Sequence, residues 1–328
     1  MPRTRFQLAV PAPFELPLAL TGHGWYDLAP HDYVAGDSRF TTVIAVREAA
    51  VDVAIEVAHH GNRDKTAAAG GLKRTRHLAI QVEGAAIAGG AIGGAAARTT
   101  VKRALRRMLR LDHDFAPFFA RCAERPTVEW AARRGGGRLL ASATLFEDLM
   151  KILFTTNCSW AATKGMAARL CAAIGPRAPS GRSAFPTPAA CAATDDAFWR
   201  DTVRAGYRGK AARRLAERFV SGEIDEATLA GTKLATLATP ELRERLLSLA
   251  GFGPYAAGLA LRLLGRHDDL ALDSWCRARL ATLANRKRPP SDRAVARRYA
   301  RYGDDRGLVL WLELTAAWHG ETSIATQR

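Results

Sequence analysis

Residues 246–258, LLSLAGFGPYAAG, constrain the fold of this chain more than any other stretch. Three leucines predict the apolar face of a first helix, two glycines predict a tight turn, and a proline predicts the start of a second helix. These residues are Leu246, Leu247, Leu249, Gly251, Gly253 and Pro254. Glycines at a helix N-terminus leave backbone N–H groups accessible, a geometry that binds an anion such as a DNA phosphate. The stretch therefore predicts a helical hairpin that could hold a phosphate backbone.

A single carboxylate, Asp273, follows eighteen residues beyond Tyr255, which is the length of one helix and one loop. Asp273 stands between the apolar residues LAL and the helical pattern SWCRARL, so we expect it to be a helix N-cap. A lone Asp before a helix is usually a cap and nothing more. The hairpin upstream makes a catalytic carboxylate the favoured interpretation here.

The chain is strongly basic, with 48 Lys and Arg against 32 Asp and Glu in 328 residues, a net charge of +16. Such a surplus favours a polyanionic partner, although an arginine-rich proteome would also produce it. The cations gather in three groups, which favours nucleic acid over a uniformly solvated surface. These groups lie at residues 98–110, 204–218 and 277–301.

The five cysteines are odd in number and show no CxxC or CxH spacing, which argues against a disulfide framework and against a zinc site. We expect reduced cysteines in a bacterial cytoplasmic protein, associated with the nucleoid and monomeric. No signal peptide and no membrane-spanning stretch is recognised. The apolar, glycine-rich residues 84–97 are expected to form a loop or a closely packed turn.

Hydrophobic patterns predict an α+β chain: an N-terminal antiparallel β domain over residues 1–98, then an all-helical domain over residues 99–328. Strands are expected within residues 14–82, with the clearest alternation at 39–46, 51–57 and 77–82, and a polar loop at 59–76. Helices are expected at 100–109, 144–156, 160–174, 195–206, 210–222, 239–249, 255–265 and 307–318.

Five ordered segments resemble the HhH-GPD superfamily of helix-hairpin-helix DNA glycosylases, most closely its 3-methyladenine glycosylase II and 8-oxoguanine glycosylase group. They are GGGRLLASATLFEDLMKIL at 135–153, TTNCSWAATKGMAARLC at 155–171, AGYRGKAARRLA at 205–216, the hairpin, and Asp273. The resemblance covers the chain from about Arg98 to the end and, more loosely, the entry strands at residues 14–28. It implies a TBP-like N-terminal β domain and a base-excision repair enzyme acting on double-stranded DNA with a damaged base.

The same resemblance assigns roles to individual residues. Asp273 would stabilise the positive charge that develops on the sugar and would activate a water molecule. Asn157 would enter the helix beside the unpaired partner base, with helix capping as an equally good alternative. The other DNA contacts would be Leu249, Gly251, Gly253, Tyr255, Ala256, Trp275 and Arg277. The base pocket would be formed by Trp160, Tyr207, Phe146, Leu310 and Leu314.

The chain departs from this family at two places. Bifunctional members carry a nucleophilic lysine where this chain has Tyr255, and a phenol cannot form an imine, so we expect a monofunctional enzyme. The Gln and Phe of the oxoguanine pocket correspond to Leu310 and Leu314 by ungapped counting. Loss of the amide favours alkylated purines, which are cationic, carry a weakened glycosidic bond and bind by stacking. The alternatives are an 8-oxoguanine or mismatch glycosylase, or an inactive DNA-binding protein.

No organic cofactor is implied. No four-cysteine run follows Cys276, so the iron–sulfur branch of the superfamily is excluded. The resemblance suggests a monovalent cation bound by backbone carbonyls of the hairpin, and no metal bound by side chains.

Overall fold

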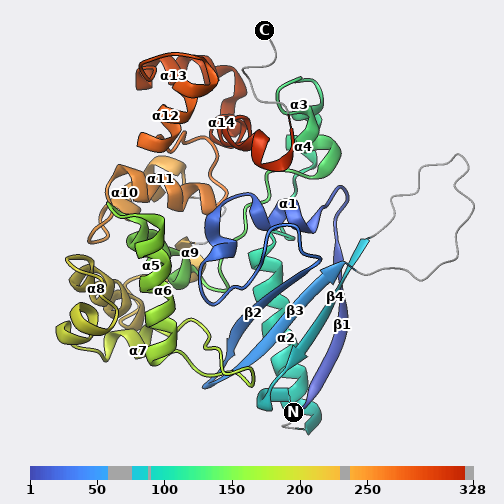
Figure 1. Cartoon of the computed structure of the whole chain (residues 1–328), viewed down its shortest axis with the longest axis vertical. Coiled ribbons are helices and arrows are strands. Elements are labelled where there is room, and N and C mark those ends of the chain that lie inside the picture. Colours follow the sequence, from blue (N-terminus) through green and yellow to red (C-terminus); the bar gives the residue numbers. More distant parts are fainter. Residues whose placement is uncertain (58–75, 88–89, 230–236, 322–328) are drawn as a thin grey trace, which may run out of the picture.

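The computed structural model describes residues 1–57, 76–87, 90–229 and 237–321 (Figure 1). Its N-terminal part holds an antiparallel four-stranded sheet in the order β1-β4-β3-β2. The strands are β1 (Arg3–Val10), β2 (Arg39–Val46), β3 (Ala49–Val57) and β4 (Arg76–Glu83). The three strands with the clearest alternation therefore form as expected, and β1 is an additional strand that the pattern did not single out.

The segment between β1 and β2 is helical rather than extended, which corrects the expectation for residues 14–28. It forms α1 (Leu16–Thr21) and η1 (Gly24–Asp27). Pro17 lies in the first turn of α1, where its missing N–H removes no helix hydrogen bond. Leu16, Leu18 and Leu20 are buried, so tertiary packing stabilises a helix in a stretch too short to be recognised from its period.

Residues 90–97 also differ from expectation, because they belong to α2 (Gly90–Met108) and not to a loop. The segment before α2 is η2 (Ala85–Ile87). Alanine has the highest helix propensity, and α2 packs against β2 with Ala97 and Val101 buried in the core. Packing therefore outweighs the low helix propensity of the glycines in this segment. The predicted domain boundary after residue 98 falls inside α2. The division into two domains remains a prediction.

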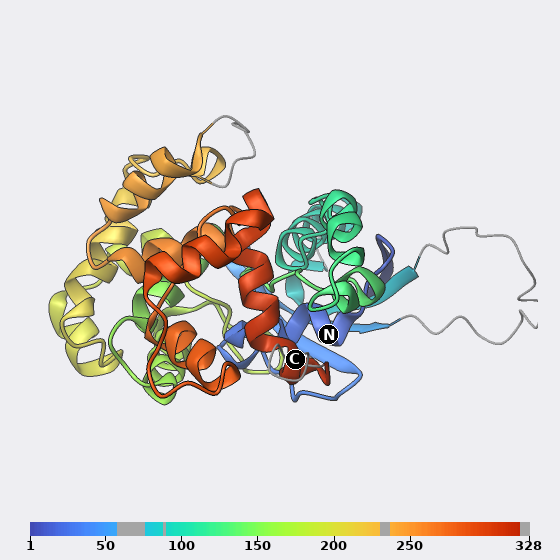
Figure 2. The same cartoon turned by 90° about the horizontal axis from the view of Figure 1, so that it is seen from above.

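The rest of the described chain is helical, as expected, and Figure 2 shows it beside the sheet. It starts with α3 (Ala116–Ala123), α4 (Glu129–Arg134), α5 (Leu145–Thr155), α6 (Trp160–Ile174), α7 (Pro188–Ala192), η3 (Phe198–Thr202), α8 (Arg208–Val220) and α9 (Glu226–Leu229). It ends with α10 (Thr239–Leu247), α11 (Pro254–Leu263), α12 (Ser274–Leu283), α13 (Asp292–Tyr299), η4 (Ala300–Asp305), α14 (Arg306–Thr315) and η5 (Ala316–His319). In the described ranges, no helix combines the length and the hydropathy needed to span a bilayer.

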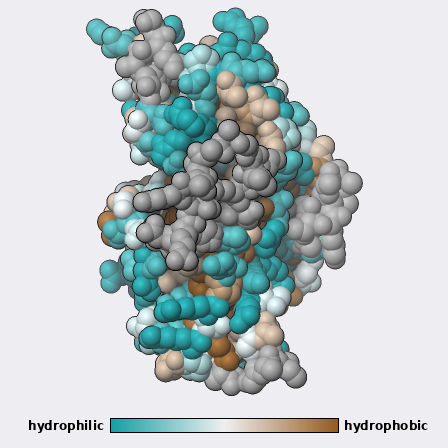
Figure 3. Space-filling model, turned by 90° about the vertical axis from the view of Figure 1, so that its right-hand side faces the viewer, coloured by the Kyte–Doolittle hydropathy of each residue, from teal (hydrophilic) through white to brown (hydrophobic). Residues whose placement is uncertain are grey.

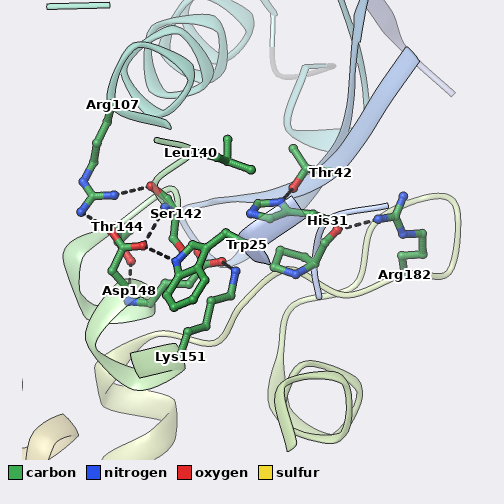
Figure 4. A network of polar contacts seen from close by, with 12 residues as sticks. Trp25, His31, Thr42, Arg107, Leu140, Ser142, Thr144, Asp148, Lys151 and Arg182 are labelled. Atoms are coloured by element: carbon green, nitrogen blue, oxygen red, sulfur yellow. Dashed lines mark hydrogen bonds and ion pairs between the residues drawn. The ribbon is translucent and has the colours of Figure 1, made fainter. Parts of the chain in front are cut away.

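A buried polar network holds the start of α5 against the N-terminal segment and α2 (Figure 4). The Asp148 carboxylate accepts hydrogen bonds from Trp25 Nε1 at 2.9 Å, from the Ser142 backbone N–H at 2.8 Å and from Arg107 Nη2 at 2.7 Å. Burial acts to raise the pKa of Asp148, but the Arg107 charge and these hydrogen bonds bring it below its ordinary value. The network fixes α5, whose other end at Thr155 reaches the candidate site.

The side chains of the first basic group, most of which lie on α2, make contacts within the molecule. Arg98 and Lys102 lie over the Phe6 ring of β1, at 5.9 and 5.3 Å from its centroid. Arg106 pairs with Asp112, and Arg107 binds the network above. The side of the molecule on the right of Figure 1 is largely hydrophilic where Figure 3 colours it, with small separate hydrophobic areas. These cations belong to the sheet side, so they add little support for nucleic acid at the hairpin.

Candidate active site

The expected hairpin is present and consists of α10, the turn at residues 248–253, and α11. In Figure 1 it lies between α12 above and α5 and α8 below. Leu246 and Leu249 are buried as expected, whereas Leu247 is 39% exposed and does not belong to the apolar face. Pro254 is the first residue of α11. The local signals of this stretch therefore specify its structure almost completely.

The two glycines of the turn serve different purposes. Gly251 has a φ of +82°, and a Cβ there would lie 2.6 Å from the Leu153 side chain of α5. Gly253 caps α11 without a side-chain hydrogen bond, and a Cβ there would meet nothing within 4 Å. Gly251 lets the turn approach α5, and Gly253 leaves space in front of α11.

The N-terminus of α11 offers backbone donors. The N–H groups of Tyr255 and Ala256 lie in its first turn, where a helix provides no acceptor for them. Ala256 and Leu249 are only 1% and 5% exposed, so these two predicted DNA contacts are covered in this structure and remain predictions. N–H groups at a positive helix end suit an anionic phosphate oxygen.

Asp273 caps α12 as expected. Its Oδ1 accepts a hydrogen bond from the Cys276 backbone N–H at 2.6 Å, and the residue is half-buried. This bond holds the carboxylate in one orientation at the start of a helix. A rigid, partly accessible carboxylate is able to face a positively charged reaction centre.

Asp273 lies close enough to Tyr255 to act on its ionisation. Burial raises the pKa of the Tyr255 phenol, and the negative charge of Asp273 raises it further. The Tyr255 hydroxyl, in turn, donates a hydrogen bond to Thr155 Oγ1 at 3.2 Å. The hairpin, the carboxylate and the end of α5 therefore meet in one place, although Thr155 and Asp273 are far apart in sequence.

Asn157 lies in the short loop that follows α5. Its backbone has a φ of +46°, its side chain is exposed, and its Nδ2 donates to the Tyr207 hydroxyl at 3.3 Å. Arg208 donates to the carbonyl oxygens of Thr156, at 2.8 Å, and Asn157, at 3.0 Å. Asn157 does not cap α6, because Ser159 has that role. The capping alternative for Asn157 is therefore removed. Its role as a DNA contact stays a prediction, and its side chain is exposed in a loop held by Arg208.

Comparison with known proteins supports the architecture. No protein-family model and no curated protein matches the sequence. Among solved structures, MBOgg1 in complex with a low-affinity DNA ligand aligns with a TM-score of 0.67 and 18% identity, over 98% of this chain and 100% of that chain. The 3-methyladenine DNA glycosylase of Archaeoglobus fulgidus aligns with a TM-score of 0.63 and 19% identity, over 94% and 98%. The chain has the HhH-GPD DNA glycosylase fold.

A third relative in structure is the apo form of the 8-oxoguanine glycosylase/lyase of Clostridium acetobutylicum, with a TM-score of 0.61 and 15% identity, over 89% of this chain and 93% of that chain. The structures with this fold therefore include a glycosylase named for an oxidised base and one named for an alkylated base. The fold alone does not choose between these substrates.

The residues expected in the base pocket differ in their exposure, and their assignment remains a prediction. Phe146, Leu310 and Leu314 are buried in the core at 1% exposure or less. Trp160 donates to Asp27 Oδ2 at 2.9 Å and covers Gly24 of η1. Tyr207 is 64% exposed beside Asn157.

Trp275, two residues after Asp273, belongs to a cluster of three tryptophans, of which sequence reasoning found one. The Trp275 ring centroid lies 5.5 Å from that of Trp311 and 5.5 Å from that of Trp318, and the latter two are 5.9 Å apart. Trp275 and Trp318 are 39% and 50% exposed, and Trp311 is 9% exposed. Leu310, which was expected in the base pocket, directly precedes Trp311 of the cluster in the sequence.

Arg277, the last predicted DNA contact, forms a bidentate ion pair with Asp292 at 2.7 and 2.8 Å. Both side chains are partly exposed, at 33% and 62%. Its assignment as a phosphate contact remains a prediction, and in this structure its guanidinium is paired with Asp292. Among the described residues, no group of three His, Cys, Asp or Glu side chains could hold a metal ion.

Proposed function

We propose that this protein is a monofunctional DNA N-glycosylase of base-excision repair. The observation that carries the proposal is the packing of the loop before Asp273 against α11, where a Cβ at Gly258 would lie 2.9 Å from Ala271 Cα, together with the cap bond that fixes the Asp273 carboxylate. In this geometry a nucleotide held by its phosphate would have its sugar near the carboxylate. The glycosylase fold supports the same reaction class.

The proposed reaction starts with extrusion of the damaged base, because an enzyme cannot reach the glycosidic bond inside the stack. Phosphate binding by the N–H groups of Tyr255 and Ala256 would hold the bent duplex. Asn157 would enter the space that the extruded base leaves. As the bond breaks, the Asp273 carboxylate would stabilise positive charge on the sugar and orient the attacking water.

We propose that no lyase step follows. Formation of a Schiff base with the sugar needs an amine, and Tyr255 offers only a phenol, whose pKa is raised by burial and by Asp273. The product would be an abasic site in an unbroken strand.

The finer part of the proposal is that the released base is alkylated, as in a 3-methyladenine glycosylase II. The partly exposed Trp275, two residues after Asp273, and Trp318 beside Trp275 support it, because indole surfaces bind a flat base by stacking without a specific hydrogen-bond pattern. The partner would be double-stranded DNA, bound by a cytoplasmic, nucleoid-associated monomer. A monovalent cation on carbonyl oxygens of the turn belongs to the same proposal; Leu249 O, which accepts the Phe252 N–H at 3.0 Å, keeps one lone pair for it.

The test is a set of duplexes that differ only in one methylated, deaminated or oxidised base, incubated with the wild type and with Asp273→Asn and scored for alkali-labile sites. Release of alkylated bases by the wild type alone would support the full proposal. Release of 8-oxoguanine or of mismatched bases would support the glycosylase reaction and refute the alkylated substrate. Binding with no release of any base would leave a DNA-binding protein without the activity.

A further inference from the structure

A buried arginine lies directly behind the tryptophan cluster. Arg262 belongs to α11, seven residues after Tyr255, and is 5% exposed. Its guanidinium carbon lies 4.4 Å from the centroid of the Trp311 ring. Its Nη2 donates to Leu270 O at 3.1 Å, in the loop that leads to Asp273. The hairpin therefore places a cation between the aromatic cluster and the carboxylate loop.

The charge of Arg262 has no direct counter-ion in the part of the chain that the structure describes. No carboxylate there forms an ion pair with it, and its Nε is buried without a hydrogen-bond acceptor. Burial lowers the pKa of Arg262, while Cys276 and Asp273 act in the opposite direction. Arginine remains protonated in proteins, so this is a buried positive charge, and burying it is unfavourable. Packing alone would be served as well by an uncharged side chain.

The position of this charge matters for any base that stacks on the exposed tryptophans. Arg262 covers Trp311, and Trp275 lies 5.5 Å beyond Trp311. The Trp275 ring centroid is therefore at most about 10 Å from the guanidinium, and a base stacked on it would lie a few ångströms farther, where a like charge at an effective dielectric constant of about 20 is disfavoured by up to roughly tenfold. A base without formal charge would not be repelled.

We infer that Arg262 is a specificity-determining residue that makes the base site select uncharged damaged bases over cationic ones. The inference rests on the proposed function and narrows its substrate class, away from cationic bases such as N3-methyladenine and toward uncharged alkylated bases. Alkylated bases include both kinds, since N7-methylguanine in DNA is cationic and 1,N6-ethenoadenine is not. The sequence favoured cationic alkylated purines, because it could not show that a cation is already buried against Trp311.

The first experiment measures single-turnover release of N7-methylguanine and of 1,N6-ethenoadenine from otherwise identical duplexes. Relative to the wild type, Arg262→Gln should shift the ratio of the two rates roughly tenfold toward the cationic base. Arg262→Lys keeps the charge and should keep the wild-type ratio, even if loosening of the loop lowers both rates. Arg200→Gln removes an exposed cation elsewhere and is the matched control. An unchanged ratio in Arg262→Gln would overturn the inference.

A second measurement does not depend on activity. In a Trp160→Phe background, Trp275 and Trp318 are the exposed tryptophans among those described. Iodide and caesium are ions of opposite charge, and both quench tryptophan fluorescence. The ratio of iodide to caesium quenching should fall in Arg262→Gln and stay unchanged in Arg262→Lys and Arg200→Gln. If the wild type releases neither base, the proposed function fails. The quenching ratios still test whether the charge of Arg262 acts at the exposed tryptophans. Equal quenching ratios in all variants would refute the electrostatic role of Arg262.

Discussion

The Tyr255 hydroxyl donates a hydrogen bond to Thr155 Oγ1 across 3.2 Å and so connects the second helix of the hairpin to the end of α5. Thr155 donates its own proton to Ile152 O, which leaves its oxygen free to accept. The contact holds the end of α5, which leads into the loop of Asn157, against the first turn of α11. Tyr255 is therefore a structural link between α11 and α5.

This position of Tyr255 predicts hydrolysis without a covalent intermediate. Incubation of the wild type with substrate DNA and borohydride should give no protein–DNA adduct, because a phenol forms no imine. Tyr255→Phe should keep base release within about tenfold, since it loses one hydrogen bond of about 1 kcal/mol. Denaturing electrophoresis detects the adduct, and its appearance would mean that an amine elsewhere reaches the sugar.

Asp273→Asn should separate catalysis from folding and binding. Asparagine is an N-cap as good as aspartate, so the bond to the Cys276 N–H should persist and stability should change little. Loss of the negative charge should lower single-turnover base release on the order of 10²- to 10³-fold, the usual effect of removing an electrostatic stabiliser. Asp195→Asn is the matched control, because Asp195 accepts a similar bond from the Phe198 N–H at 2.8 Å on another element. Equal activity of both variants would exclude Asp273 as the catalytic group.

The glycine pair of the turn predicts two different defects. Gly251→Ala should destabilise the protein by about 1 kcal/mol or more, since φ is positive and the new Cβ would collide with Leu153. Gly253→Ala meets nothing in the free protein, so its unfolding free energy should stay within about 0.5 kcal/mol of wild type. Its methyl group would nevertheless stand where a phosphate approaches, so duplex affinity should fall. Urea unfolding and a fluorescence binding titration test both claims, and unaltered affinity in Gly253→Ala would contradict a phosphate site at this turn.

Local signals in the sequence specify much of this molecule. The helix over 160–174 begins and ends where the pattern predicts, Ser159 caps it, and the hairpin and the Asp273 cap follow their turn and capping residues. The helix at 16–21 and the first part of α2, residues 90–99, could not be predicted, because packing against distant elements decides them.

The same limit applies to the candidate site. Its carboxylate and its hairpin are defined by neighbours in sequence. The Trp275–Trp311–Trp318 cluster and the buried Arg262 depend on how α11, α12 and α14 pack, and no spacing along the chain encodes that packing.

Buried histidines predict a loss of stability in mild acid. Burial lowers the pKa of His23 from 6.5 to about 4, even though its Nε2 lies 2.5 Å from Leu140 O. Between these values the unfolded chain binds a proton that the folded protein does not, so stability is complete above pH 6.5 and falls as the pH drops toward 4. At pH 5.0 the share of His23 is about 2 kcal/mol.

Urea unfolding at pH 7.5 and pH 5.0 measures this loss. The raised pKa of the buried Glu147 has the opposite sign, so the comparison of wild type with His23→Gln isolates the histidine. The variant should lose less stability between the two pH values than the wild type does. An identical loss in both proteins would mean that His23 titrates normally.

The Arg277–Asp292 pair predicts that one substitution will strengthen DNA binding. Asp292 holds the guanidinium in a bidentate contact on the side of α12 that also carries Asp273, one turn earlier. Exposed pairs of this kind contribute little to stability, so a phosphate can compete for Arg277. Asp292→Asn removes the competing charge and should raise duplex affinity severalfold at low salt. It should also make the slope of log K against log salt steeper by about 0.9, the value for one additional phosphate contact.

Two comparisons distinguish this mechanism from a simple change in net charge. Asp201→Asn removes the same charge from a similar bidentate pair with Arg200, and it should leave the salt slope unchanged because Arg200 has no expected phosphate nearby. In an Arg277→Gln background, Asp292→Asn should no longer steepen the slope, since the released guanidinium is absent. If Asp201→Asn and Asp292→Asn strengthen binding equally, the effect is one of net charge, and Arg277 is only a structural partner of α13.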